Sequence, residues 1–195
     1  MEQGLLEQRL NFLFEIDKLK SVLRQTKLYD DSRFENSAEH SWHLALAVMT
    51  FHDKSNVPVD LTKCLKMALV HDLVEIYTGD TFLYHEGHDD NAEEAKAAEK
   101  IFSIIDDLPL MLELKTLWFE FEARQTPEAK FVKALDRFLP LTQNWKTHGT
   151  SWKKHGIRYS QVVEKNAYIQ DGSELLWQQA LKIFEECRVA GNLLE

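Results

Sequence analysis

The stretch CLKMALVHDLVEIYTGD, residues 64–80, decides the fold class and contains the first candidate site residues. Its middle part is apolar nearly all round at helical spacing, which is typical of a buried helix. Three polar residues, His71, Asp72 and Glu75, stand inside this apolar part. We expect one helix from about Leu61 to Tyr77. It would place the three side chains on neighbouring parts of one face, because residues three and four apart are neighbours on a helix.

These buried polar residues have two explanations. Burying two carboxylates and an imidazole without partners is costly, so partners must exist. A divalent metal ion would pair with all three groups. Alternatively, Asp72 and Glu75 form buried ion pairs with lysines or arginines, and His71 is a hydrogen-bonded core histidine. The stretch alone does not decide between the two explanations.

The rest of the chain also has helical spacing, and no alternating run of β-branched residues predicts a strand. Asn36 and Glu39 suit a capping box at a helix start, and Thr126-Pro127 suits another start. We therefore predict an all-α fold, a helical bundle that forms a single domain over residues 1–195. Further helices are expected at about Gly4–Arg24, Asn36–Lys54, Asn91–Ile105, Pro109–Ala123, from Pro127, near Ser160 and at Ser173–Ala190.

Composition limits the classes of function. The net charge of −9 argues against a nucleic-acid polymer as partner, because such proteins generally carry a basic face. No apolar run approaches the roughly 20 residues that span a bilayer, and the N-terminus does not resemble a signal peptide. The two cysteines form no CxxC pair, which indicates a reducing compartment. We expect a cytoplasmic protein without membrane contact.

Two further polar residues extend the pattern outward from residues 64–80. His40 lies in the first turn after the capping box, and Asp136 stands in the otherwise apolar run FVKALDRFLP, residues 131–140. Together they give the order His, His-Asp, Asp along the chain. The local sequences RFENSAEHS (33–41), ALVHDLVEIYTGD (68–80) and AKFVKALD (129–136) resemble the 5′-deoxynucleotidase branch of the HD-domain superfamily of metal-dependent phosphohydrolases.

The resemblance implies a fold of the HD-domain type, with a metal-site core at about 24–145 and C-terminal helices at about 157–190. It implies that one divalent transition metal ion is held by His40, His71, Asp72 and Asp136. Mixed nitrogen and oxygen ligands suit Co²⁺, Mn²⁺, Fe²⁺, Ni²⁺ or Zn²⁺. The implied activity is release of phosphate from deoxynucleoside monophosphates.

The resemblance also implies roles for three other residues. Glu75 and Asp80 match acidic catalytic positions, and Arg24 matches a basic residue that would bind the substrate phosphate. Arg24 is expected at the end of the first helix. Many family members follow this arginine with a tryptophan, whereas this chain has Gln25-Thr26-Lys27-Leu28. We therefore expect the pocket around Arg24 to differ.

Two other functions remain open: an HD-type di-iron oxygenase and a non-catalytic nucleotide-sensing module. The ferritin type of di-iron site is disfavoured, because the chain has no Glu-x-x-His. A homodimer is expected from the apolar runs at 117–121 and 174–184, which could instead pack inside the monomer. The roles of His43, His85 and His88 stay undecided.

Overall fold

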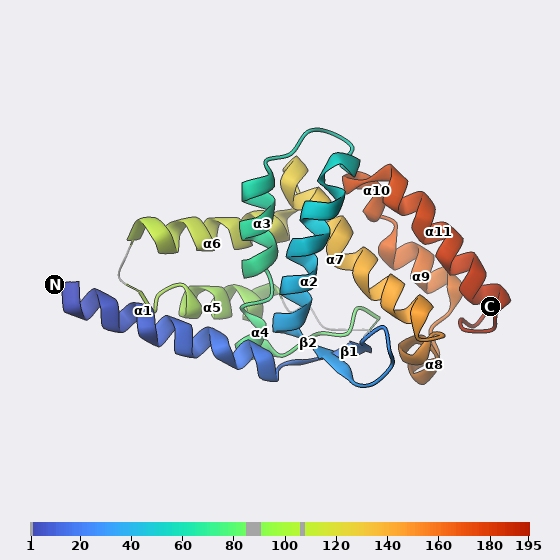
Figure 1. Ribbon diagram of the computed structural model, residues 1–195, viewed down its shortest axis with the longest axis horizontal. Helices are drawn as coiled ribbons and strands as arrows, with labels where there is room; N and C mark the ends of the chain where they lie inside the picture. Colours follow the sequence, from blue (N-terminus) through green and yellow to red (C-terminus); the bar gives the residue numbers. More distant parts are fainter. Residues whose placement is uncertain (1, 85–90, 106–107) are drawn as a thin grey trace.

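The computed structural model describes residues 2–84, 91–105 and 108–195. Helices make up most of it, which confirms the all-α prediction (Figure 1). A two-stranded antiparallel sheet adds to them, with β1 at Leu23–Lys27 and β2 at Phe34–Asn36. The helices are α1 (Glu2–Asp17), α2 (Ser37–Phe51), α3 (Leu61–Val70), α4 (Glu75–Thr78), α5 (Asn91–Ile101), α6 (Leu108–Ala123), α7 (Pro127–Lys146), α8 (Thr150–His155), α9 (Tyr159–Asn166), α10 (Ile169–Gly172) and α11 (Glu174–Val189).

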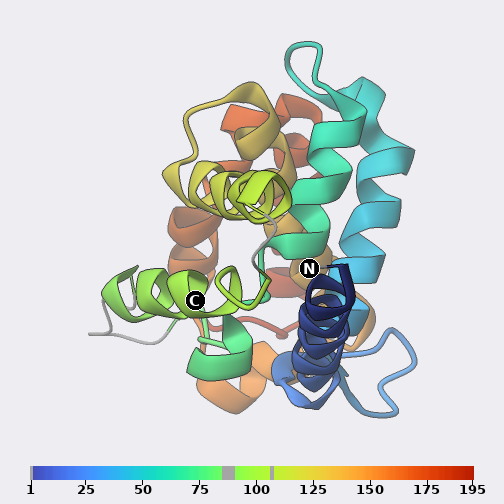
Figure 2. The same ribbon diagram turned by 90° about the vertical axis from the view of Figure 1, so that its left-hand side faces the viewer.

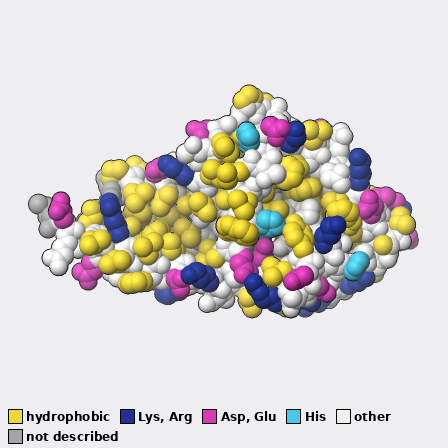
Figure 3. Space-filling view, in the orientation of Figure 1, with side chains coloured by type: hydrophobic (Ala, Val, Ile, Leu, Met, Phe, Trp, Pro, Cys, Tyr) yellow, Lys and Arg dark blue, Asp and Glu magenta, His cyan; other side chains and the backbone are white. Residues whose placement is uncertain are grey.

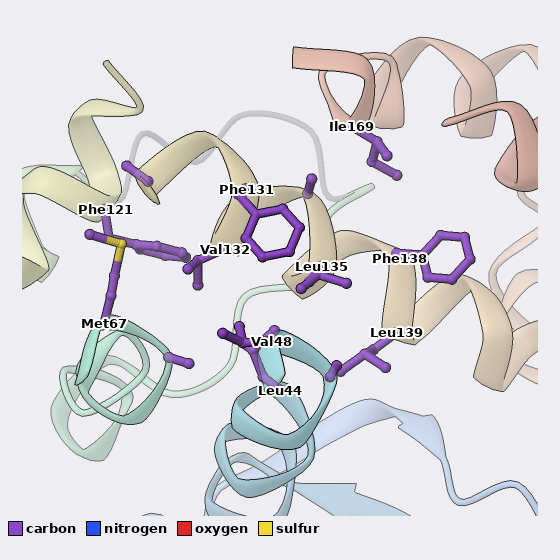
Figure 4. Close-up of a cluster of buried hydrophobic side chains, with 14 of the residues drawn as sticks. Leu44, Val48, Met67, Phe121, Phe131, Val132, Leu135, Phe138, Leu139 and Ile169 are labelled. Carbon is purple, nitrogen blue, oxygen red and sulfur yellow. The ribbon is translucent and has the colours of Figure 1, made fainter. Parts of the chain in front are cut away.

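Helix α7 is the centre of the core. It starts as predicted, with Thr126 as N-cap and Pro127 in the first turn. Figure 4 shows Phe131, Val132 and Leu135 of α7 among side chains of α2 and α3. On its other side α7 packs against α10 and α11. The helix that carries Asp136 is therefore held from both sides.

Helices α1, α5 and α6 lie on the same side of this centre in Figure 1, and α1 is seen nearly end-on in Figure 2. Helix α1 has no buried residue within its described length. Among the helices of the described residues, none is both long and apolar enough to cross a bilayer.

The first helix is shorter than predicted, which changes the position of Arg24. Helix α1 ends at Asp17, a 3₁₀ turn covers Lys18–Ser21, and Val22 is extended. Arg24 lies in β1, where burial alternates along the strand, so Arg24 and Thr26 are buried side by side on one face. The prediction of a helix to Arg24 was wrong because the pairing of β1 with β2 is not local.

The predicted helix Leu61–Tyr77 is also interrupted, and the interruption falls at the first site residues. Helix α3 ends at Val70, residues 71–74 form a tight turn, and α4 begins at Glu75. The backbone N–H of Glu75 donates to the carbonyl of Asp72 (3.0 Å), three residues back. A hydrogen bond that spans three residues is typical of a 3₁₀ turn, whereas an α-helical hydrogen bond spans four. His71 and Glu75 are therefore held by two helices joined by a turn.

Gly172 allows α10 to approach α7 closely, and its replacement should reduce stability. A Cβ atom built at Gly172 would lie 2.3 Å from the carbonyl oxygen of Lys130 and 2.8 Å from the Cβ of Ala134. Because backbone cannot yield like a flexible side chain, Gly172→Ala should cost about 1–3 kcal/mol of unfolding free energy. Thermal unfolding followed by circular dichroism would measure it. Gly4→Ala is the control, since no atom lies within 4 Å there; equal melting temperatures for both variants would contradict the prediction.

Candidate metal and catalytic site

Three side chains, one from a helix and two from a turn, meet at the centre of the candidate site. His40 comes from the first turn of α2, behind the predicted capping box, in which Asn36 accepts from the backbone N–H of Glu39. His71 and Asp72 come from the turn after α3. One potential ligand atom of each lies within 4.8 Å of the others.

Asp136 of α7 lies against both histidines. Its Oδ1 is 2.9 Å from Nε2 of His40 and 3.6 Å from Nε2 of His71. The Nε2 of His71 is in turn 3.0 Å from Oδ1 of Asp72. The structure thus brings together the four residues that the sequence predicted as ligands, from three separate parts of the chain.

A hydrogen bond on the far side of the His71 ring and a carboxylate on the far side of the His40 ring orient the two histidines. The Nδ1–H of His71 donates to the backbone carbonyl of Ala68 (2.9 Å), which leaves Nε2 facing Asp72 and Asp136. The Nδ1 of His40 lies 3.5 Å from Oε2 of Glu35, a fully buried carboxylate. Such partners on the outer nitrogen fix ring orientation and tautomer in metal sites.

The residues fit a divalent metal ion. Within the described part of the chain, the Nε2 atom of His71 is buried and has no hydrogen-bond partner, although it faces two carboxylates. An acceptor nitrogen close to carboxylate oxygens is unfavourable unless a proton or a metal ion lies between them. Burial works against protonation, but Asp72 and Asp136 outweigh it and raise the pKa of His71 to about 10. A metal ion would take the place of that proton.

The surroundings of Asp136 and Glu75 shift the pKa values of the two carboxyl groups in opposite directions. Burial alone would raise the pKa of Asp136. Instead that pKa is held well below its usual range, because His40 and His71 contact the carboxylate and the charges of Arg137 and Lys133 favour its ionised form. Burial raises the pKa of Glu75 well above its usual range, and the charge of Asp72 adds to it. A carboxyl group with a raised pKa suits proton transfer near neutral pH, whereas an ionised one suits ligation.

Glu75 and Asp80 both lie at the site. The Oε2 of Glu75 accepts a hydrogen bond from the Ser37 hydroxyl (2.5 Å), which fixes the carboxylate beside the first turn of α2. Asp80 follows Gly79, whose φ of 77° ends α4. Burial also raises the pKa of Asp80.

Arg24 lies among carboxylates rather than at a free position. Its Nη1 donates to Oδ2 of Asp72 (2.9 Å) and lies 3.5 Å from Asp80 and 4.0 Å from Glu75. Its Nε lies 3.7 Å from Glu35. Burial opposes the charge of the guanidinium, but these carboxylates outweigh it and raise the pKa of Arg24.

A cavity of about 300 Å³ opens next to these residues. Its acidic wall contains Asp72, Glu75, Asp80 and Asp136. Basic side chains line it as well: Arg24, Arg124, Lys133, Arg137 and Lys165. It has the volume of a small-molecule site, and its mixed charges suit an anionic ligand beside a cation.

Sequence reasoning missed Glu35, Lys133 and Arg137. Lys133 is buried 3.8 Å from Asp136, and Arg137 is at the same distance. Their signal was the position of two basic residues in KALDR, around the candidate ligand. Glu35 gave no such signal, because a single glutamate before a capping box is usually exposed.

Three histidines had no role assigned from the sequence, and of these the structure describes only His43. His43 is half-buried between Tyr29 and Trp42, and its Nδ1 lies 4.0 Å from Glu35, so it borders the site from outside. His85 and His88 lie outside the described residues.

Comparison with known proteins agrees with this geometry. Residues 16–177 match the HD domain family. The crystal structure of a predicted metal-dependent phosphohydrolase from Magnetospirillum magnetotacticum MS-1 has a TM-score of 0.95 and 39% identity, covering 100% of this chain and 98% of that one. The 5′-deoxynucleotidase hdd1 of Schizosaccharomyces pombe is 34% identical over 139 residues, which are 68% of each chain. The 5′-deoxynucleotidase HDDC2 of Danio rerio is 31% identical over 146 residues, which are 71% of this chain and 68% of the relative.

Proposed function

The chain belongs to the HD-domain family of metal-dependent phosphohydrolases, and we propose that within this family it releases phosphate from deoxynucleoside 5′-monophosphates. The observation that carries the proposal is the meeting of His40, His71, Asp72 and Asp136 beside the 300 Å³ cavity. The names of the relatives from Schizosaccharomyces pombe and Danio rerio support the substrate class.

In this proposal the four residues hold one divalent transition metal ion. When bound, the metal supplies Lewis acidity toward the phosphate and activates water for attack on phosphorus. Glu75 accepts the proton of the attacking water at its carboxylate, and Ser37 keeps that carboxylate in position. Asp80 lies on the same wall and donates a proton to the leaving oxygen, a role that the pKa of this carboxyl, raised by burial, favours.

A panel of nucleotides tests the substrate class. Deoxy- and ribonucleoside 5′-monophosphates, each assayed for phosphate release with Co²⁺, Mn²⁺, Fe²⁺, Ni²⁺ and Zn²⁺, should show turnover of the deoxy series. Release from none of them would reject the proposal. Two irons per chain would favour the HD-type di-iron oxygenase, and nucleotide binding without turnover under every metal would favour the sensing module.

Removal of the metal should abolish activity. Exhaustive dialysis against a chelator should reduce phosphate release to background, because the ligand residues themselves contain no Lewis acid. Adding back about one equivalent of the preferred metal per chain should restore it. Elemental analysis before and after dialysis is the necessary control. Full activity in protein shown to be free of metal would contradict the proposed chemistry.

We also propose that Arg24 contacts the substrate phosphate, since it lines the cavity beside Asp72 and Asp80. Arg24→Ala should raise KM by about 10- to 100-fold, the worth of one charge-assisted hydrogen bond. The measurement is steady-state kinetics at constant metal occupancy, with Arg9→Ala on α1 as the control. An unchanged KM would show that Arg24 serves only to neutralise the carboxylates.

A homodimer is the proposed assembly, but through a different surface from the one expected. Most apolar side chains of the runs 117–121 and 174–184 are buried inside the monomer, among them Trp118, Phe121, Trp177 and Phe184. Exposed apolar side chains lie instead on α1 and α6, and Figure 3 shows hydrophobic side chains gathered at that end of the molecule. Leu6, Leu10, Leu13 and Phe14 of α1 and Leu112 of α6 are more than 40% exposed. A cytoplasmic location stays a prediction.

A further inference from the structure

A second, smaller pocket adjoins the catalytic cavity, and several buried polar atoms of its wall have no hydrogen-bond partner among the described residues. Its volume is about 50 Å³, and Arg24, Asp80 and Arg137 line both spaces. We call it the side pocket. Its remaining lining includes Thr26, Phe82, Asn144, Ser151, Trp152 and Asn166. A group entering the side pocket would belong to a molecule that also reaches the site residues.

Four buried oxygen atoms of the side pocket lack hydrogen-bond partners among the described residues. They are Oγ1 of Thr26, Oδ1 of Asn144, Oγ of Ser151 and Oδ1 of Asn166. These side chains are at most 9% exposed. Buried polar atoms are nearly always satisfied by protein, water or ligand. Four of them around one small space therefore indicate that something polar enters it.

The orientation of the two amides defines what they can bind. The Nδ2 of Asn144 donates to the backbone carbonyl of Pro140 (3.0 Å). The Nδ2 of Asn166 donates to the carbonyl of Val162 (2.7 Å) and to the hydroxyl of Tyr84 (3.2 Å). Because the amino sides are engaged, both asparagines present carbonyl oxygens, which only accept. A ligand group must therefore supply N–H or O–H donors.

Aromatic side chains complete the side pocket. Trp152 is buried in its wall, and the rings of Phe82 and Tyr84 lie edge to face with centroids 5.3 Å apart. Planar rings pack well against such surfaces. A cavity needs roughly 10–15 Å³ of accessible volume to hold one water molecule, so a volume of about 50 Å³ admits the edge of a ring rather than a whole purine.

We propose that the side pocket recognises the amino-bearing edge of the nucleobase, so that this enzyme prefers deoxynucleotides whose base carries an exocyclic amino group. This inference rests on the proposed function. An amino group offers two N–H donors at one position, which matches two acceptor oxygens. A keto oxygen at the same position would face the amide oxygens without a proton between them and leave them unsatisfied.

Two substrate pairs that differ at that position test the inference: dCMP against dUMP, and dAMP against dIMP. In the metal-loaded natural protein, kcat/KM should favour the amino member by at least about 10-fold in one pair or both. Equal values within both pairs would overturn the inference, leave the proposed function intact, and indicate that water alone satisfies the four oxygens. Phosphate release from none of the four would reject both.

Two variants test whether the side pocket causes the preference. Asn144→Leu and Asn166→Leu remove the acceptors and should bring the ratio within each pair close to one, mainly through KM. Asn11→Leu, on the exposed face of α1, should keep the ratio of the natural protein. If the leucine variants do not fold, the ratios of the natural protein alone still decide. A preference that survives folded Asn144→Leu and Asn166→Leu would show that the side pocket does not recognise the base.

Discussion

The Glu75→Gln variant is expected to keep its metal ion and to lose turnover by a factor of about 10² to 10⁴, the usual contribution of a general base or acid. Glutamine has the shape of glutamate and can still accept from Ser37, so the turn between α3 and α4 should persist. It cannot take up a proton at neutral pH. Metal content by elemental analysis and kcat from phosphate release measure the two parts of the prediction.

A matched variant separates this loss from a general charge effect. Glu113 on α6 is exposed and paired with Lys66, so Glu113→Gln removes the same charge away from the cavity and should leave kcat unchanged. If Glu75→Gln turns over substrate as fast as the natural protein, Glu75 has a structural role, and proton transfer belongs to another group.

Asp136→Asn should have the largest effect on metal binding. Asp136 lies against Nε2 of both His40 and His71, so its charge is central to the candidate ligand set. A neutral amide is a weaker ligand, and its amino side would compete with the metal for the histidine nitrogens. We expect most of the metal to be lost, with a fall in kcat/KM of at least about 10³, since the metal contributes several kcal/mol to the transition state.

Elemental analysis of the purified variant and phosphate release with excess metal would check both effects. Asp171→Asn is the control, because Asp171 is exposed on α10. Circular dichroism should show the helical content of the natural protein in both variants. Retention of a full metal equivalent by Asp136→Asn would remove Asp136 from the ligand set.

Features that depend on neighbouring residues were predictable from the sequence. The capping box of Asn36 and Glu39 and the start of α7 at Thr126-Pro127 formed where expected, because caps use side chains three residues apart. Helix α8 was not among the predicted helices. Two glycines in the left-handed region, Gly149 and Gly156, flank this short helix.

Features that depend on distant contacts were not predictable. The residues between Val70 and Glu75 favour a continuous helix, yet the chain turns there. The indole of Trp118 donates to the carbonyl of His71, and Arg24 binds Asp72, so contacts from α6 and β1 accompany the turn. Arg24 itself was predicted in a helix because nothing in residues 22–27 indicates their partner strand, whose paired residues lie 7 to 13 positions later.

The candidate ligands could be identified from the sequence because they are polar residues inside apolar helices. Glu35 could not, because its burial against His40 and Arg24 follows from the pairing of β2 with β1. The unpartnered side-chain oxygens of Asn144 and Asn166 could not be predicted either. They depend on which end of each side-chain amide forms a hydrogen bond with the backbone.

The position of the candidate ligand residues on α2, on the turn after α3 and on α7 has a consequence for folding. A metal ion bound to all of them would be a crosslink that closes two long loops of the chain, in a protein whose cysteines Cys64 and Cys187 form no disulfide. Because the unfolded chain cannot offer this ligand set, an ion at 100 times its dissociation constant would stabilise the native state by about 2.7 kcal/mol. The abundance of folded protein in a cell would then vary with the supply of that metal.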